Sequence, residues 1–211
     1  MSGSAYNSLA ALMTESVSFT TMSDATQADH DLLADRLEPY LAQAADRFLA
    51  ALAAQRLERD SGYQIDRCEH ALQTATRARR DGADSDWVVA ALLHDLGDGF
   101  APMNHDRMAA EILRPYVREE VTWVVAHHGV FQQHYTGRFN GSDPDARERF
   151  RDSPYFTACA DFCERWDQCS FDPEYESDSL ESFRDELETV FSRTPFDPTN
   201  LRGDESEGVE Q

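Results

Sequence analysis

Hydrophobic residues recur at spacings of three and four along most of this chain, which is the period of an amphipathic helix. Segments that alternate strictly between apolar and polar residues, as a half-buried strand does, are absent from the sequence. A first helical region should begin near Thr26, after a cap at Ser23 or Asp24, with a break at Pro39. Further helices are predicted over residues 65–80, 87–96, 105–117, 119–128, 155–170 and 180–192. The region 129–154 is expected to be mostly loop, because it contains Gly and Pro residues.

These elements predict an all-α fold, and 211 residues are enough for one well-buried core. We expect a single helical bundle over residues 23–195, with its core at about 63–191 and an added helical segment at its N-terminal side. Residues 1–22 are rich in small and polar side chains and are predicted to be flexible. Residues 196–211 end in an acidic stretch and are predicted to form a disordered tail.

The net charge of −21 narrows the classes of function. All 19 basic residues are arginine, which excludes a Schiff-base lysine and a P-loop lysine. A long-range negative field disfavours nucleic acids and anionic membranes, so we expect a small-molecule substrate. The four cysteines form no Cys-X-X-Cys pair, and no apolar run approaches the ~18 residues that span a bilayer. We therefore expect a cytoplasmic protein, whose oligomeric state the sequence does not specify.

Six of the seven histidines fall between His70 and His134. Three of them lie in the short motifs Leu-His-Asp-Leu-Gly at 93–97 and Ala-His-His-Gly at 126–129. Imidazole is the commonest protein ligand for metals, and a neighbouring aspartate adds a hard oxygen that suits Fe, Mn or Mg. The cluster therefore predicts a metal site.

Helical phase separates the better ligand candidates from their neighbours. His128 continues the apolar positions Val121, Val124 and Val125, whereas His127 falls to one side. By the same argument Asp167 lies on an apolar stripe, and Asp161 lies on the polar face of its helix. A carboxylate among apolar groups is costly unless a cation lies beside it, so we expect Asp167 to face a metal.

A lone core histidine is more often structural than a ligand, and His30 and His134 taken singly fit that description. The larger set is difficult to explain in this way. Its members are too many for one tetrahedral ion and suit two metals bridged by Asp95. The predicted ligands are His70, His94, Asp95, His105, His128 and Asp167.

The pattern of His70, His94–Asp95 and Asp167 resembles that of the HD-domain superfamily. The stretches at 69–73, 81–84 and 90–97 resemble in particular the branch of mixed-valence diiron oxygenases that contains 2-amino-1-hydroxyethylphosphonate dioxygenase and, more remotely, myo-inositol oxygenase. His105 and His128 are similar to the two extra histidines of the two-metal members.

This resemblance implies a mixed-valence Fe(II)/Fe(III) pair bridged by Asp95, with O2 as co-substrate. The implied reaction cleaves a C–C or C–P bond next to a hydroxyl-bearing carbon of a hydroxy-phosphonate or polyol-like molecule. Residues expected to contact the substrate or support the ligands are Tyr63, His127, His134, Arg138 and Arg165.

Two departures from the family pattern concern the substrate. Asp98 stands where the phosphonate oxygenases have a histidine, and Gln132 and Gln133 stand near the position of their phosphonate-binding lysine. The resemblance to the phosphonate oxygenases therefore predicts the fold and the metal ligands of this chain better than it predicts the substrate. The alternative activity is a phosphohydrolase that uses Mn or Mg on a nucleotide or small phosphate ester. A scaffold without chemistry ranks last, because no ligand is missing.

Overall fold

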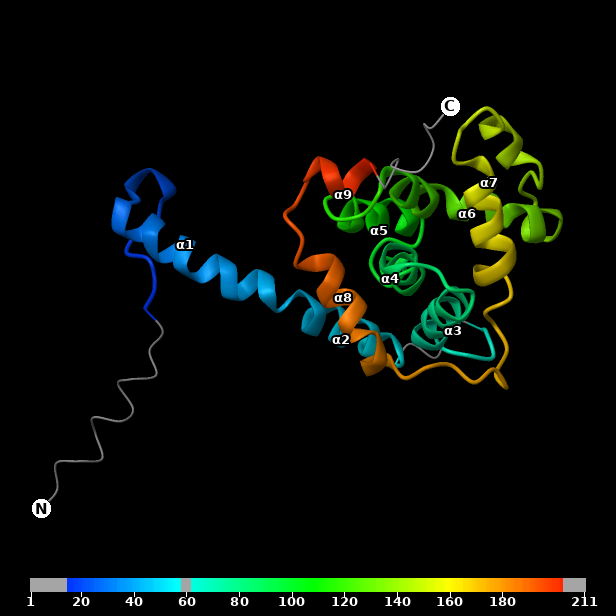
Figure 1. Cartoon of the computed structure of the whole chain (residues 1–211), viewed down its shortest axis with the longest axis horizontal. Coiled ribbons are helices and arrows are strands. Elements are labelled where there is room, and N and C mark those ends of the chain that lie inside the picture. The colour runs from blue at the N-terminus through cyan, green and yellow to red at the C-terminus, as the bar shows by residue number, and fades with distance from the viewer. Residues whose placement is uncertain (1–14, 58–61, 203–211) are drawn as a thin grey trace, which may run out of the picture. The chain divides into compact units, whose positions relative to one another are not determined.

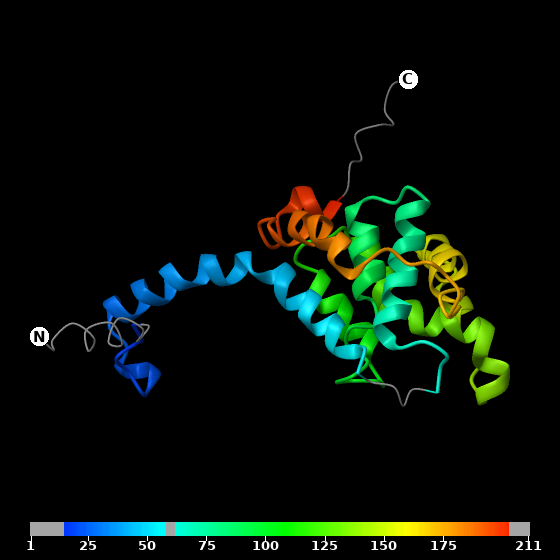
Figure 2. The same cartoon turned by 90° about the horizontal axis from the view of Figure 1, so that it is seen from below.

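A computed structural model describes residues 15–57 and 62–202 of the protein. These residues form helices and turns with no strand among them, which confirms the predicted all-α fold (Figure 1, Figure 2). The chain divides into two compact units, Met1–Gln43 and Ala44–Gln211. The sequence predicts a bundle over residues 23–195, with its core at about 63–191 and an added helical segment at its N-terminal side. Much of the predicted flexible N-terminus and of the acidic tail lies outside the described residues.

The described part of the first unit is dominated by helix α1 (Gln27–Ala42), which follows a short 3-10 turn at Met22–Asp24. The cap is Thr26 rather than Ser23 or Asp24, because Thr26 and Asp29 form a reciprocal capping box. The predicted break at Pro39 is absent, and α1 runs through this residue to Ala42. Pro39 lies in the exposed last turn, where water can reach the backbone carbonyl that loses its partner.

The core of the second unit is built around helix α4 (Ser85–Leu93), whose residues from Val88 to Leu93 are all buried. A helix that is apolar on every side must be covered on every side. Helices α3 (Arg67–Arg80), α6 (Glu119–Asn140) and α8 (Arg184–Phe191) pack against it, and Figure 1 shows it end-on near the middle of this unit.

Shorter elements complete the second unit. They are α2 (Ala44–Gln55), α5 (His105–Leu113), the 3-10 turn η4 (Ala146–Phe150), α7 (Phe156–Phe162), the π-helical turn η5 (Cys163–Asp167), the 3-10 turn η6 (Leu180–Phe183) and α9 (Pro198–Arg202). Helix α9 corrects the prediction that the chain is disordered from residue 196, since the described part of that segment contains a helical turn.

Helix α4 ends earlier than predicted. Asp84 caps its start by accepting a hydrogen bond from the Trp87 amide, and the helix stops at Leu93 rather than at residue 96. His94 and Asp95 consequently lie on the turn that follows α4. On a turn, two adjacent side chains can point toward the same place. Adjacent side chains on a helix point about 100° apart, which makes this arrangement more difficult.

Helix α6 is much longer than the predicted segment 119–128. It continues through Gly129 to Asn140, and Gly141 ends it in the left-handed conformation (φ 81°). Phe131 and Gly137 are buried and extend the core-facing side of the helix. A Cβ at Gly137 would lie 3.0 Å from the backbone of Ser142 and Pro144, so this glycine permits a close backbone approach rather than a loop.

Candidate metal centre

The structure brings the six predicted ligands together from five separate places in the fold. His70 lies in the first turns of α3, and His94 and Asp95 follow α4. The other three lie at the start of α5, within α6 and at the end of the π-helical turn: His105, His128 and Asp167. Each helix is anchored by its own apolar residues, so the polar groups converge where the elements meet.

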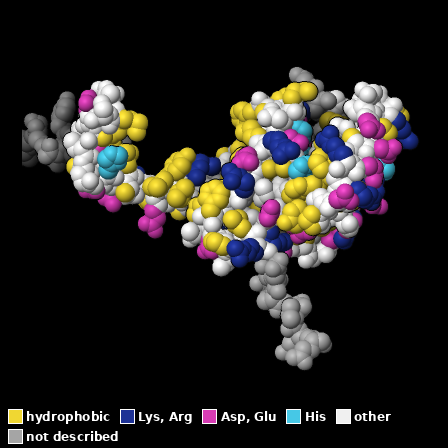
Figure 3. Space-filling model, turned by 90° about the horizontal axis from the view of Figure 1, so that it is seen from above, with side chains coloured by type: hydrophobic (Ala, Val, Ile, Leu, Met, Phe, Trp, Pro, Cys, Tyr) yellow, Lys and Arg dark blue, Asp and Glu magenta, His cyan; other side chains and the backbone are white. Residues whose placement is uncertain are grey.

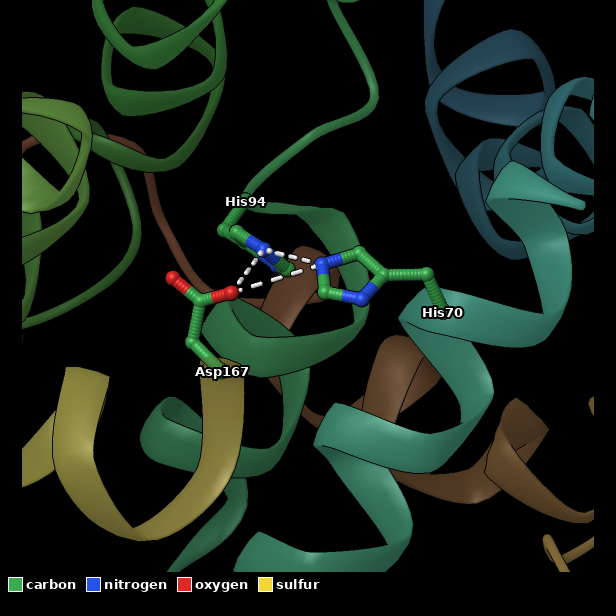
Figure 4. A group of neighbouring side chains, drawn as sticks. All are labelled: His70, His94 and Asp167. Carbon is green, nitrogen blue, oxygen red and sulfur yellow. Dashed lines mark hydrogen bonds and ion pairs between the residues drawn. The ribbon is translucent and has the colours of Figure 1, made fainter. Parts of the chain in front are cut away.

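His70, His94 and Asp167 form a buried triad (Figure 4). The two Nε2 atoms are 3.2 Å apart, and Asp167 Oδ1 lies 3.4 Å from His70 Nε2 and 3.6 Å from His94 Nε2. Ligands that share one ion at about 2.1 Å are separated by about 3.0 Å in octahedral and about 3.4 Å in tetrahedral geometry. These spacings therefore fit one ion between the three donors.

Asp95 lies between this triad and the two remaining histidines. Its Oδ2 is 3.4 Å from the Nε2 atoms of both His70 and His94. Its Oδ1 is 3.1 Å from His128 Nε2 and 3.3 Å from His105 Nε2. One carboxylate thus presents one oxygen to each of two donor groups, which is the arrangement needed for a ligand that bridges two ions.

All four histidines are held in the same tautomer by backbone carbonyl groups. Their Nδ1 atoms lie 2.7–3.0 Å from the carbonyl oxygens of Ser170, Ala91, Pro102 and Val125, for His70, His94, His105 and His128 in turn. A carbonyl only accepts, so each Nδ1 carries a hydrogen and each Nε2 is available as a ligand.

The carbonyl that orients His70 is positioned by a side chain of α3. Gln73 is fully buried, donates to the carbonyl of Asp172 at 2.7 Å and accepts from its amide at 3.2 Å. These two bonds fix the segment after Asp167 against α3. They therefore hold both Ser170, whose carbonyl accepts from His70, and Phe171, whose ring stacks on His70 at 4.5 Å.

The carboxylates of the centre are stabilised by positive charge beside them. Burial opposes ionisation of Asp167, but the nearby imidazoles, His94 foremost, outweigh it and lower its pKa. Burial likewise opposes protonation of His70, yet the hydrogen bonds that the protonated ring donates to Asp167 and Asp95 raise its pKa to about 10. The second oxygen of Asp167, Oδ2, is buried without a hydrogen-bond partner among the described residues. The site therefore fits a bound cation, which would replace these protons and occupy the unpaired oxygen.

Metal loading at pH 7 should release about two protons per chain. In the metal-free protein the pKa is about 10 for His70 and about 9 for His128, where Asp95 outweighs the effect of burial. Both rings are thus protonated at pH 7 and must lose that proton to bind an ion. Apparent affinity should rise on the order of 100-fold per pH unit between pH 7 and 9. Calorimetric titration in buffers of different ionisation enthalpy measures the proton count.

The same shifts set how the stability of the metal-free protein depends on pH. Raised histidine pKa values contribute stability that is fully present below the unfolded pKa of about 6.5 and is lost as the pH rises through about 9 and 10. Two results together would show that these histidines are already neutral at pH 7: no proton is released when the protein binds metal, and the metal-free protein loses no stability above pH 7.

The centre is enclosed on one side and open on the other. His70, His94, His128 and Asp167 are buried, whereas the side chains of His105 and Asp95 are 23 % and 25 % exposed. Two adjoining cavities, of about 200 and 420 Å³, share the open side. Both are lined by Tyr63, His70, Asp95, His105 and Phe171. A small molecule would therefore approach past Asp95 and His105.

Of the five residues expected around the substrate, only Tyr63 lines these cavities. His127 stacks on Trp123 at 4.0 Å and lines a different groove, and His134 is exposed beside Tyr135. Arg165 pairs with Asp81 at 2.7 Å, and Arg138 lies exposed over Phe139. These four residues therefore line neither cavity: each is held elsewhere by its own partner or faces solvent.

Several cavity residues were not predicted from the sequence. Arg67 lines the smaller cavity and pairs with Asp98 at 2.6 Å, and it lies only one helical turn before His70. Gln132 and Thr136 line the larger cavity one and two turns after His128. Helical spacing from each histidine would have found all three, had α6 been predicted at its full length.

Four histidines and two aspartates meet at one point of an all-α bundle. This arrangement is typical of the class of helical proteins that bind metal ions at such a centre. Within that class, the model of the HD domain matches residues 67–164, so this part of the chain contains an HD domain. HD domains bind divalent metals, and the family is generally enzymatic. The match ends three residues before Asp167. A comparison with curated proteins gave no match.

The surface of the second unit is chemically mixed. On the face drawn in Figure 3, acidic and arginine side chains are interspersed with apolar ones. Over residues 15–57 and 62–202, no helix combines the length and the apolar character needed to cross a membrane.

Proposed function

We propose that the protein is a non-haem diiron oxygenase that uses O2 to cleave a C–C or C–P bond next to a hydroxyl-bearing carbon of a small polar substrate. The observation that carries this proposal is the division of Asp95 between two histidine groups. It supports a two-ion centre rather than a single ion. The donors are nitrogen and oxygen with no thiolate, a set compatible with iron.

Bound irons would supply the redox chemistry with O2, while the chain binds, orients and excludes water. His70, His94 and Asp167 would hold one ion, His105 and His128 the other, and Asp95 both. The four carbonyl bonds fix the imidazole donors before any ion arrives, which lowers the cost of assembling the site. Phe171 stacks on His70, and Tyr63 packs on Phe171 at 5.0 Å, so an aromatic wall limits water on that side.

A phosphohydrolase that uses Mn or Mg is the second candidate, because the same six donors suit those ions and could activate a bound water. Transfer of a phosphoryl group requires cationic side chains that stabilise its oxygens. Among the residues that the structure describes, one arginine lines the two cavities at the centre, Arg67, and it is already paired with Asp98. This scarcity of cations favours the oxygenase.

Anaerobic reconstitution should load two irons per chain and give the EPR signal of an exchange-coupled Fe(II)/Fe(III) pair. Metal analysis counts the ions, and an oxygen electrode then screens hydroxy-phosphonates and polyols for substrate-dependent O2 uptake. Mn- and Mg-loaded protein, assayed with phosphate esters, serves as the matched test of the hydrolase. One tightly bound divalent ion, phosphatase activity and no O2 uptake with any of these compounds would overturn the proposal.

A further inference from the structure

Among the described residues, the larger cavity at the metal centre is lined by no basic side chain beyond the histidine ligands. Its volume is about 420 Å³. Apart from the predicted ligands, it is lined by Tyr63, Gly129, Gln132, Tyr135, Thr136, Gln168 and Phe171. Every hydrogen-bonding group in this list is a neutral amide or hydroxyl.

Helix α6 delivers the main polar groups of this cavity in register with a ligand. Gln132 and Thr136 follow His128 at intervals of four residues, so all three lie on one side of the helix. Thr136 donates its hydroxyl hydrogen to the carbonyl of Gln132 at 3.3 Å and keeps its oxygen as an acceptor. The Gln132 amide offers both donors and an acceptor to the cavity.

The smaller cavity does not provide an anion site either. Its one guanidinium, that of Arg67, is 2.6 Å from Asp98, and Asp66 adds a second carboxylate to the lining. Fixed side-chain charge on this side of the centre is therefore net negative even before Asp95 is counted. The chain as a whole carries −21, which further opposes an anionic ligand.

A phosphonate or phosphate group is bound through charge-assisted hydrogen bonds from arginine or lysine. The described lining of the larger cavity supplies neither, whereas its amide and hydroxyl groups pair well with the hydroxyls of a neutral molecule. The rings of Phe171 and Tyr63 give its carbon skeleton an apolar surface. We propose that the centre selects a small, uncharged, hydroxyl-rich molecule over a phosphonate, with Gln132 and Thr136 as specificity-determining residues. This inference rests on the proposed function, because it places that substrate beside the two-ion centre.

Protein loaded with Zn²⁺ tests this selectivity without redox chemistry. Calorimetry would compare xylitol as the neutral probe with 2-hydroxyethylphosphonate as the anionic probe. Wild type should bind xylitol more tightly. Gln132→Leu and Thr136→Val, which remove hydrogen-bonding groups at similar volume, should each weaken xylitol binding about 5- to 10-fold. Gln133→Leu is the matched control, because Gln133 is the next residue but does not line the cavity, and it should change nothing.

A charge-introducing variant provides the converse test. Gln132→Lys should weaken xylitol binding and strengthen phosphonate binding at least 10-fold, whereas Gln133→Lys adds the same charge outside the cavity and should not. Tighter binding of phosphonate by wild type, unchanged xylitol binding in Gln132→Leu, or binding of neither probe would each overturn the inference. Failure of the proposed function gives a different result: the iron-loaded protein consumes no O2 with any probe while the Zn²⁺-loaded protein still prefers xylitol.

Discussion

Asp95→Ala should reduce the tightly bound metal from two ions per chain to at most one and should lower kcat/KM for O2-dependent turnover by at least about 1,000-fold, or ~4 kcal/mol. The reason is that the two oxygens of Asp95 face both histidine groups, at 3.1–3.4 Å. Without it, the ion between His105 and His128 would keep only two protein ligands from the predicted set. Metal analysis and the EPR signal of the iron pair measure the loss.

Asp98→Ala provides the control for this variant. Asp98 lies three residues further along the same turn and lines the same smaller cavity. It pairs with Arg67 at 2.6 Å and lies 3.7 Å from Nδ1 of His105, so its contact is with the nitrogen that is not the expected ligand atom. This variant should keep two ions. If Asp95→Ala also kept two ions and the exchange-coupled signal, Asp95 would not be the bridge.

The burial of the candidate ligands could be predicted from sequence because helical phase is a local property. His128 and Asp167 continue apolar stripes, and both are buried in the structure, while Asp161 is exposed as expected. That argument needs only the period of the helix and the cost of burying a polar group. It does not need the three-dimensional arrangement of the helices.

The surroundings of the centre could not be predicted in the same way. A negatively charged substrate would need arginine, which favours residues such as Arg138 and Arg165, but a charge on an exposed helix face carries no information about which cavity it lines. The end of α6 was misplaced because Gly129 and Gly137 are typical of loops, although the close approach at Gly137 makes glycine the residue that fits within this helix. Gln132 and Thr136 were missed as a consequence.

The π-helical turn at Cys163–Asp167 is a second feature that local pattern does not reveal. Within it the Gln168 amide donates to the Cys163 carbonyl, five residues back, at 2.9 Å. Before this turn, in α7, Cys159 and Phe162 are buried while Ala160 is only partly so, and within the turn Trp166 and Asp167 are buried. The wider turn shifts the helical phase between these two buried sets. Turns of this kind occur frequently at functional sites, and this one ends at a predicted ligand.

Asp167→Ala should remove one ion per chain, the one expected between His70 and His94, while Asp161→Ala should keep both. The two aspartates lie six residues apart in the same helical segment, but Asp167 is 2 % exposed and Asp161 faces solvent. Loss of the first carboxylate takes an anionic ligand from a buried triad whose donors lie 3.2–3.6 Å apart. Loss of the Asp161 carboxylate removes only a group that water already solvates. Metal content after exhaustive dialysis distinguishes them.

The two aspartate variants can also be compared in metal-free protein, by the pKa of His70, so that the result does not depend on how much metal each variant binds. Burial opposes protonation of His70, and the hydrogen bond and charge of Asp167 are among the interactions that raise its pKa to about 10. Asp167→Ala should therefore lower the pKa of His70, whereas Asp161→Ala should leave it unchanged, as followed by NMR titration of the imidazole. If Asp161→Ala instead lost the ion and shifted His70, the π-helical turn would present the opposite face of this segment to the centre.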